Sequence, residues 1–151
     1  LPALGHRPHG RPAHRPRARP VTPPAPSLDG RSFVDVSPRR AGDVGDGTRF
    51  DYHEEPDGTV WARYEGGAVR LGFLVGTRSG DELVFRYAHV TAAGDTATGH
   101  CASRIEVLAD GRLRLHETWE WDSRPGHGTS VLEEIPSSPP AGDDQSSSYS
   151  P

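Results

Sequence analysis

Aromatic and ionisable side chains recur at alternate positions in the second half of the chain. Side chains of these kinds could together form a binding site. An arginine holds a carboxylate or phosphate through two parallel hydrogen bonds. Histidine and tyrosine donate and accept hydrogen bonds, and tryptophan rings stack on flat ligands. Such groups converging in a pocket with aromatic walls are typical of a small-molecule site. The candidate ligand-binding residues are Tyr87, His89, His100, Arg104, Glu117, Trp119 and Trp121.

Catalysis and metal binding are weaker hypotheses for the same residues. A glutamate beside a histidine can act as acid and base, so Glu117 could pair with His89 or His100. Two histidines are too few ligands for a metal site, and we expect neither a metal nor a cofactor. Cys101 directly follows His100. In a strand the two side chains face opposite sides and cannot form a thiolate–imidazole pair. We therefore expect Cys101 to be a structural thiol on the outer face, and we assign no catalytic residues.

The composition excludes several other classes of site. The 151 residues include no lysine, which excludes a Schiff-base lysine and the lysine of a phosphate-binding loop. One cysteine excludes an intrachain disulfide and a multi-cysteine zinc or iron–sulfur site. No apolar run approaches the roughly 20 residues of a membrane-spanning helix. We therefore expect no membrane-spanning segment.

Short segments rich in β-branched and aromatic residues recur along the middle of the chain, separated by glycine-containing turns. None shows helical periodicity over about ten residues. About eight strands joined by short hairpins predict an antiparallel meander, and a sheet of that size usually closes to remove its edges. We expect an all-β fold, an antiparallel up-and-down β-barrel, with a β-sandwich as the alternative. The expected strands are 31–37, 48–55, 59–65, 68–78, 82–91, 96–106, 112–121 and 128–135.

The hairpin turns set the strand register, and the register decides which side chains face the interior. A three-residue turn at 56–58 aligns Phe50 with Tyr64. A three-residue turn at 79–81 turns Phe73 inward, which keeps the apolar residues on one face. The expected apolar interior is Phe50, Tyr52, Val60, Ala62, Tyr64, Val69, Leu71, Phe73, Val75, Leu83, Phe85, Tyr87, Leu115, Trp119 and Trp121.

The two turns beside the sixth strand decide which polar residues join this interior. If each turn has two residues, His100 lies in one cross-strand row with Tyr87 and Trp121. Arg104 then faces Glu117 inside the barrel. This pair could plug one end of a filled barrel, or its arginine could take a ligand in a hollow one. We expect a small-molecule-binding barrel rather than an enzyme, with a partly aromatic or apolar, anionic ligand. A filled barrel acting as a protein-interaction module is an alternative.

The two ends of the chain differ from the middle in composition. Residues 1–27 carry eight prolines and five arginines without an acid, and residues 136–151 are rich in serine and proline. We expect two disordered tails around a barrel domain at 28–135.

The domain carries 12 arginines and 19 acids, which argues against nucleic-acid binding by the folded part. Only the arginine-rich tail could contact nucleic acid. The absence of a secretory signal favours a cytoplasmic location; the sequence predicts no oligomeric state.

Several runs, in order, resemble a family of small bacterial proteins often labelled N-acetylglutamate synthase. They are DGRSF (29–33), VWARYEGGAVRLGFLVG (60–76), FRYAHV (85–90), TGHC (98–101), DGRLRLHETWEW (110–121) and EEI (133–135). The resemblance implies an avidin-like or lipocalin-like small barrel. Avidin-like barrels bind small ligands with interior tryptophans, a role that Trp119 and Trp121 would take. The label implies acetyl-CoA-dependent acetylation of glutamate, which is the alternative activity.

Overall fold

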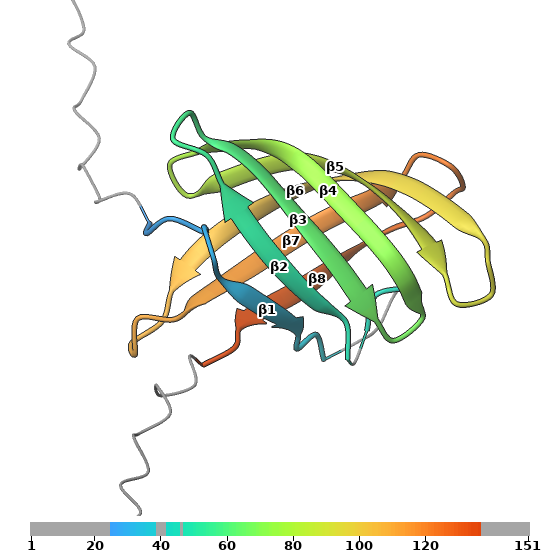
Figure 1. Cartoon of the computed structure of the whole chain (residues 1–151), viewed down its shortest axis with the longest axis horizontal. Helices are drawn as coiled ribbons and strands as arrows, with labels where there is room; N and C mark the ends of the chain where they lie inside the picture. The colour runs from blue at the N-terminus through green and yellow to red at the C-terminus, as the bar shows by residue number, and fades with distance from the viewer. Residues whose placement is uncertain (1–24, 39–41, 46, 137–151) are drawn as a thin grey trace, which may run out of the picture.

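The computed structural model describes residues 25–38, 42–45 and 47–136. They form a closed barrel of eight antiparallel strands that pair in chain order (Figure 1). β1 pairs with both β2 and β8, which closes the barrel. The predicted all-β barrel is confirmed, and the β-sandwich alternative is wrong. The strands are β1 (Ser32–Asp35), β2 (Arg49–Glu54), β3 (Thr59–Gly66), β4 (Val69–Ser79), β5 (Glu82–Thr91), β6 (Thr96–Val107), β7 (Leu113–Trp121) and β8 (His127–Glu134).

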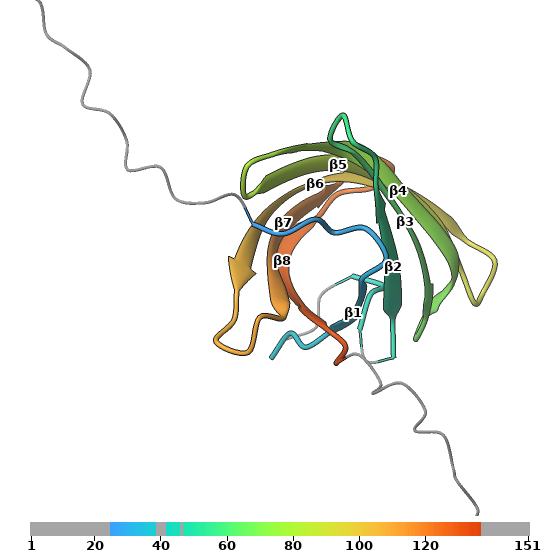
Figure 2. The ribbon, with the colours of Figure 1, turned by 60° about the vertical axis from the view of Figure 1, so that its left-hand side comes forward.

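The segment before β1 closes one end of the barrel. Figure 2 shows this segment crossing the opening between the strand ends. Leu28 is fully buried there, and the Arg78 guanidinium donates hydrogen bonds to the carbonyl oxygens of residues 25 and 26. Arg78 also pairs with Glu54 at 2.8 Å, and both side chains are largely buried. The last residues of the expected N-terminal tail therefore pack on the barrel, whereas its predicted disorder at 1–24, like that of 137–151, lies outside the described residues.

Large apolar side chains fill the half of the barrel next to this closed end. Phe33 and Tyr52 contact each other edge to face, with ring centroids 5.2 Å apart. Burial of apolar surface of this kind is the main favourable contribution to folding. The fully buried side chains include Leu28, Phe33, Tyr52, Val60, Leu83, Leu113, Leu115 and Leu132.

The register between β2 and β3 is the predicted one. Phe50 pairs with Tyr64. The turn at 56–58 has three residues, because the Gly58 N–H donates to the Glu55 carbonyl oxygen and Gly58 has a φ of 86°. Glycine adopts this left-handed conformation without steric cost, so the turn length follows from the sequence.

The register between β4 and β5 differs from the prediction. The turn has two residues rather than three, because Ser79 pairs with Glu82. Leu74 of β4 therefore faces inward and is 2 % exposed. Phe73 and Val75 lie on the outer face instead, where they are 49 % and 58 % exposed.

Both turns beside β6 are longer than predicted. The loops are residues 92–94 and 109–111, so each has three residues where we expected two. Each loop ends in a glycine, Gly94 or Gly111, with a φ of 89°. A register shift of one residue turns every side chain of a strand to the other face. Cys101 and Ser103 are therefore buried inside the barrel. His100 and Arg104 lie on the outer face, so the predicted rows that placed them inside are wrong.

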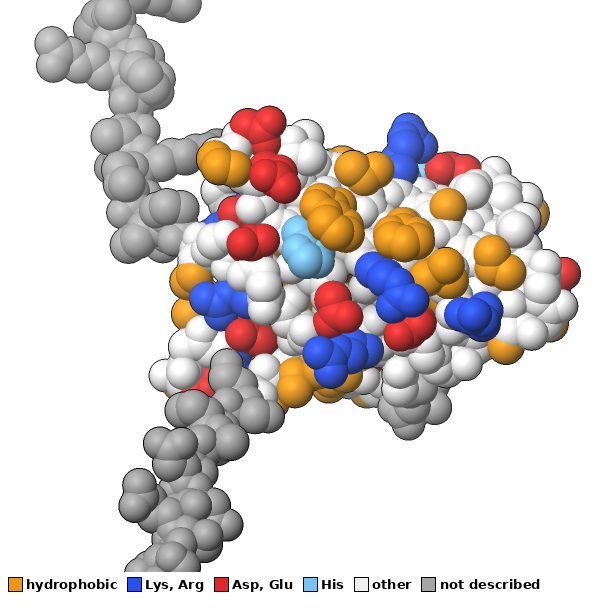
Figure 3. All heavy atoms as spheres, in the orientation of Figure 1, with side chains coloured by type: hydrophobic (Ala, Val, Ile, Leu, Met, Phe, Trp, Pro, Cys, Tyr) orange, Lys and Arg blue, Asp and Glu red, His pale blue; other side chains and the backbone are white. Residues whose placement is uncertain are grey.

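The outer face of the barrel mixes apolar side chains with ion pairs (Figure 3). Trp61 and Val75 pair across β3 and β4 and are both exposed. Trp61 stacks on His53 with ring centroids 4.0 Å apart. Arg63 and Glu65 form an exposed ion pair at 3.1 Å, a kind that contributes little to stability because water screens it. Trp61 therefore lies on the outer face of the barrel and does not contribute to its interior.

Within the part of the chain that the structure describes, no helix has the length and hydropathy to cross a membrane. The cytoplasmic location stays a prediction.

Candidate ligand-binding site

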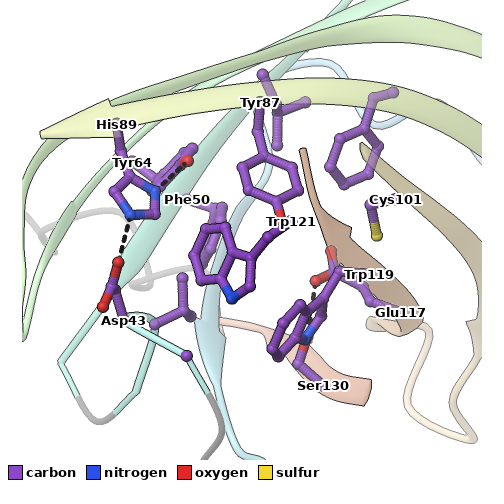
Figure 4. Close-up of a pocket in the computed structure, with 14 residues that line it drawn as sticks. Asp43, Phe50, Tyr64, Tyr87, His89, Cys101, Glu117, Trp119, Trp121 and Ser130 are labelled. Atoms are coloured by element: carbon purple, nitrogen blue, oxygen red, sulfur yellow. Dashed lines mark hydrogen bonds and ion pairs between the residues drawn. The ribbon is translucent and has the colours of Figure 1, made fainter. Parts of the chain in front are cut away.

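A pocket opens at the end of the barrel opposite Leu28 (Figure 4). Its cavity volume is about 50 Å³, which is room for a few water molecules, and the cavity is open to solvent at its mouth. The lining residues are Gly42, Asp43, Val44, Phe50, Tyr64, Leu74, Phe85, Tyr87, His89, Cys101, Glu117, Trp119, Trp121 and Ser130.

The structure brings together five of the seven candidate ligand-binding residues. They are Tyr87 and His89 on β5, with Glu117, Trp119 and Trp121 on β7.

The other two candidates lie on the outer face of β6, away from the pocket. His100 is hydrogen-bonded at 2.8 Å to Asp122, and its side chain is 45 % exposed. Arg104 is exposed and pairs in register with Glu82 and His116. The predicted pair of Arg104 with Glu117 is therefore wrong, because the three-residue turns turn β6 over.

Glycines on neighbouring strands make room for the aromatic walls. A Cβ added to Gly72 would lie 2.3 Å from the Tyr64 ring, and one added to Gly99 would lie 2.2 Å from the Tyr87 hydroxyl. Each ring therefore lies against the backbone of the adjacent strand, where a side chain would otherwise stand. A glycine that pairs with an aromatic residue on the next strand is a sequence pattern from which these pocket walls could have been predicted.

His89 links the barrel wall to the loop between β1 and β2. Its imidazole is 1 % exposed, with Nδ1 2.9 Å from the Tyr64 hydroxyl and Nε2 2.9 Å from Asp43 Oδ2. A carboxylate only accepts, so Nε2 carries a proton, and in the neutral ring Nδ1 accepts from Tyr64. Burial raises the pKa of Tyr64, which keeps this hydroxyl protonated. Sequence reasoning missed Asp43, since it lies in an irregular loop 46 residues before His89.

Arg124 lies at the rim of the pocket. Its guanidinium is 2.9 Å from Asp43 Oδ2 and 4.1 Å from the centroid of the Trp121 ring. The second contact is a cation–π interaction. The Trp121 ring also contacts Tyr87 and Trp119, at centroid distances of 5.8 and 5.4 Å. The rim is thus a continuous aromatic cluster that already accepts one cation.

Glu117 is the buried acid of the pocket. Its side chain lies inside, and Oε2 accepts a hydrogen bond from the Ser130 hydroxyl at 2.9 Å. Among the described residues, Oε1 has no hydrogen-bond partner. Burial raises the pKa of this carboxyl to about 7; the hydrogen bond from Ser130 opposes the shift, and the charge of Asp35 adds to it. Glu117 is therefore partly protonated near neutral pH.

Comparison of the sequence with models of known protein families identifies the family of this chain. The model described as avidin-like protein matches residues 26–135, which include all eight strands. The chain belongs to this family. Avidin-like barrels typically bind small ligands. Comparison with curated proteins and with solved structures gives no significant match. The avidin-like resemblance is confirmed, and the acetyltransferase activity stays a prediction.

Cys101 lines the pocket of this avidin-like barrel, although we expected it on the outer face. The residue is 2 % exposed. Burial raises the pKa of its thiol, and the charge of Glu117 raises it further. A protonated, buried thiol is a poor nucleophile, which agrees with a structural role.

The candidate acid and the candidate base of this avidin-like barrel are not hydrogen-bonded to each other. In the described part of the chain, Glu117 is hydrogen-bonded to Ser130, whereas His89 is hydrogen-bonded to Tyr64 and Asp43. The candidate acid and base thus have separate partners. Residues 25–38, 42–45 and 47–136 hold no group of three or more His, Cys, Asp or Glu side chains placed to bind a metal.

Proposed function

We propose that this protein binds a small organic molecule non-covalently in the pocket at the open end of the barrel. The observation that carries the proposal is the pocket itself, which has aromatic walls and a few convergent polar groups. Membership of a family whose barrels typically bind small ligands supports it. The body of the ligand packs against Tyr87, Trp119 and Trp121, and its polar group reaches toward Glu117.

The charge of the pocket changes the ligand expected from the sequence. An anionic ligand was expected because Arg104 was placed inside, and Arg104 lies on the outer face. The acids in the described lining are Asp43, which forms an ion pair with Arg124 at the rim, and Glu117, which has no arginine partner there. The pocket therefore favours a neutral or cationic ligand over an anion.

Trp121→Ala is expected to abolish ligand binding, because it removes one wall of the pocket. The test is a thermal-shift screen of the full chain with small amines, alcohols, acids, glutamate and acetyl-CoA. A ligand of the native barrel should raise Tm by several degrees in the wild-type protein but not in this variant. Trp61→Ala is the matched control, since Trp61 lies on the outer face, and should keep the shift.

A panel without any shift, or a shift that persists in Trp121→Ala, would contradict the proposal. Release of CoA from acetyl-CoA in the presence of glutamate would instead support the acetyltransferase activity.

A further inference from the structure

One oxygen of the buried Glu117 carboxyl is left without a partner in the described part of the chain. Ser130 donates to Oε2, while Oε1 receives no hydrogen bond, and the residue is 8 % exposed. Ser103 lies directly opposite Glu117 in the register of β6 and β7, and its buried hydroxyl also lacks a partner among these residues. A buried acceptor without a hydrogen-bond donor costs free energy, so a ligand that donates an N–H to Oε1 should bind more tightly than one that does not.

Aromatic rings surround the space next to this carboxyl. Trp119 and Trp121 lie 5.4 Å apart between ring centroids, and Tyr87 contacts Trp121 (Figure 4). The faces of such rings attract cations. The Arg124 guanidinium over Trp121 shows that this ring accepts one. Aromatic faces beside an unpaired carboxylate are the chemistry that recognises an ammonium group.

We propose that the ligand is a small organic cation, an alkyl- or arylammonium ion that donates an N–H to Glu117 Oε1. Its carbon atoms pack against Trp119 and Trp121. This proposal rests on the function proposed above and names its ligand class. An anion would instead be repelled by the Glu117 carboxylate, since Arg104 lies outside the barrel and Arg124 is already paired with Asp43.

Binding of such a cation is coupled to the ionisation of Glu117. The groups that face Glu117 are Asp35 on β1, Tyr52 on β2, Tyr64 on β3, Tyr87 on β5, Cys101 on β6 and Ser130 on β8. Burial raises the pKa of the three tyrosines and the cysteine, so these groups stay neutral near pH 7. The carboxyl of Glu117, with a pKa of about 7, is half-protonated there. Affinity for a cation should therefore rise with pH through this range.

Isothermal titration calorimetry of the full chain with three probes tests the ligand class. 2-Phenylethylamine, 2-phenylethanol and 3-phenylpropionate have similar shapes and differ in charge. At pH 8 the amine should bind roughly tenfold more tightly than the alcohol, and the propionate should bind least. In the wild-type protein the affinity for the amine should fall roughly tenfold from pH 8 to pH 6, because Glu117 takes up a proton.

Glu117→Gln keeps the shape of the side chain and removes its charge. In this variant the preference for the amine and its pH dependence should both disappear, while the alcohol binds as it does to the wild-type protein. Glu120→Gln, on the outer face of the same strand, should leave all three affinities unchanged.

Three results would overturn the ligand class. They are an alcohol or propionate that binds as tightly as the amine, an amine preference that survives in Glu117→Gln, and no binding by any of the three probes. The proposed function is separate: it fails only if the broader thermal-shift panel also gives no compound that depends on Trp121.

Discussion

Replacing Glu117 by glutamine is expected to stabilise the folded protein by about 3 kcal/mol at pH 8. Burial raises the pKa of this carboxyl from 4.5 to about 7. One pKa unit corresponds to about 1.4 kcal/mol. Between these two values the folded state binds more protons than the unfolded state, so the stability of the wild-type protein falls as pH rises from about 4.5 to above 7. A glutamine is neutral throughout and still accepts a hydrogen bond from Ser130.

Chemical denaturation of both proteins between about pH 4 and pH 8 measures this effect. The stability difference should grow from near zero at the lowest pH to its full value at the highest. Glu120→Gln is the matched control, because Glu120 is exposed on the same strand, and it should show no such trend. A glutamine variant less stable than the wild-type protein at pH 8 would mean that Glu117 has a favourable charged partner in the fold.

Gly76→Ala is expected to destabilise the barrel by about 3 kcal/mol or more. A Cβ at this position would lie 2.0 Å from the carbonyl oxygen of Val84 and 2.5 Å from the Cβ of Phe85. Both atoms are fixed by the β5 backbone, so the clash is relieved only if β4 and β5 separate. Phe85 also lines the pocket, and the variant should lose ligand-induced stabilisation as well.

Gly80→Ala, in the turn that joins the same two strands, is the control for Gly76→Ala. A Cβ there meets nothing within 4 Å, but its φ of +61° is unfavourable for alanine. The expected loss is about 1 kcal/mol. Chemical denaturation compares the two variants. A loss at Gly76 no larger than that at Gly80 would show that β4 tolerates a side chain at this contact and would contradict the packing described for β4 and β5.

The strand positions could be predicted from the sequence because glycine-containing turns separate residues of high β-propensity. The register could be predicted only where the turn length was unambiguous. The Pro-Asp-Gly turn at 56–58 aligned Phe50 with Tyr64 as expected. The Asp-Gly turn at 110–111 fits both a two-residue loop and a three-residue loop that ends in a left-handed glycine. The structure has the second, which turned β6 over and moved Arg104 outside.

The same one-residue shift reverses the expected role of Glu117. With Arg104 beside it, removal of Glu117 would leave a buried positive charge and destabilise the fold. In the structure Glu117 has Ser130 as its partner, so neutralisation is favourable instead. An arginine–glutamate pair does lie at one end of the barrel, but it is the pair of Arg78 and Glu54.

The inward face of β7 could be predicted from the alternation of its residues, and this placed Glu117, Trp119 and Trp121 correctly in the interior. The contact of Asp43 with His89 could not be predicted, because it depends on how the irregular loop between β1 and β2 folds over the strand ends. Local patterns describe strands, whereas contacts from loops depend on the assembled barrel.

The three tryptophan indole signals in a ¹H–¹⁵N NMR spectrum of the full chain test the central claim most directly. Trp119 and Trp121 line the pocket, and Trp61 lies on the outer face. Titration with the compound that gives the largest thermal shift should move the signals of Trp119 and Trp121 in a saturable manner and leave that of Trp61 unchanged. Saturable movement of the Trp61 signal alone, or no movement of the other two, would contradict ligand binding inside the barrel.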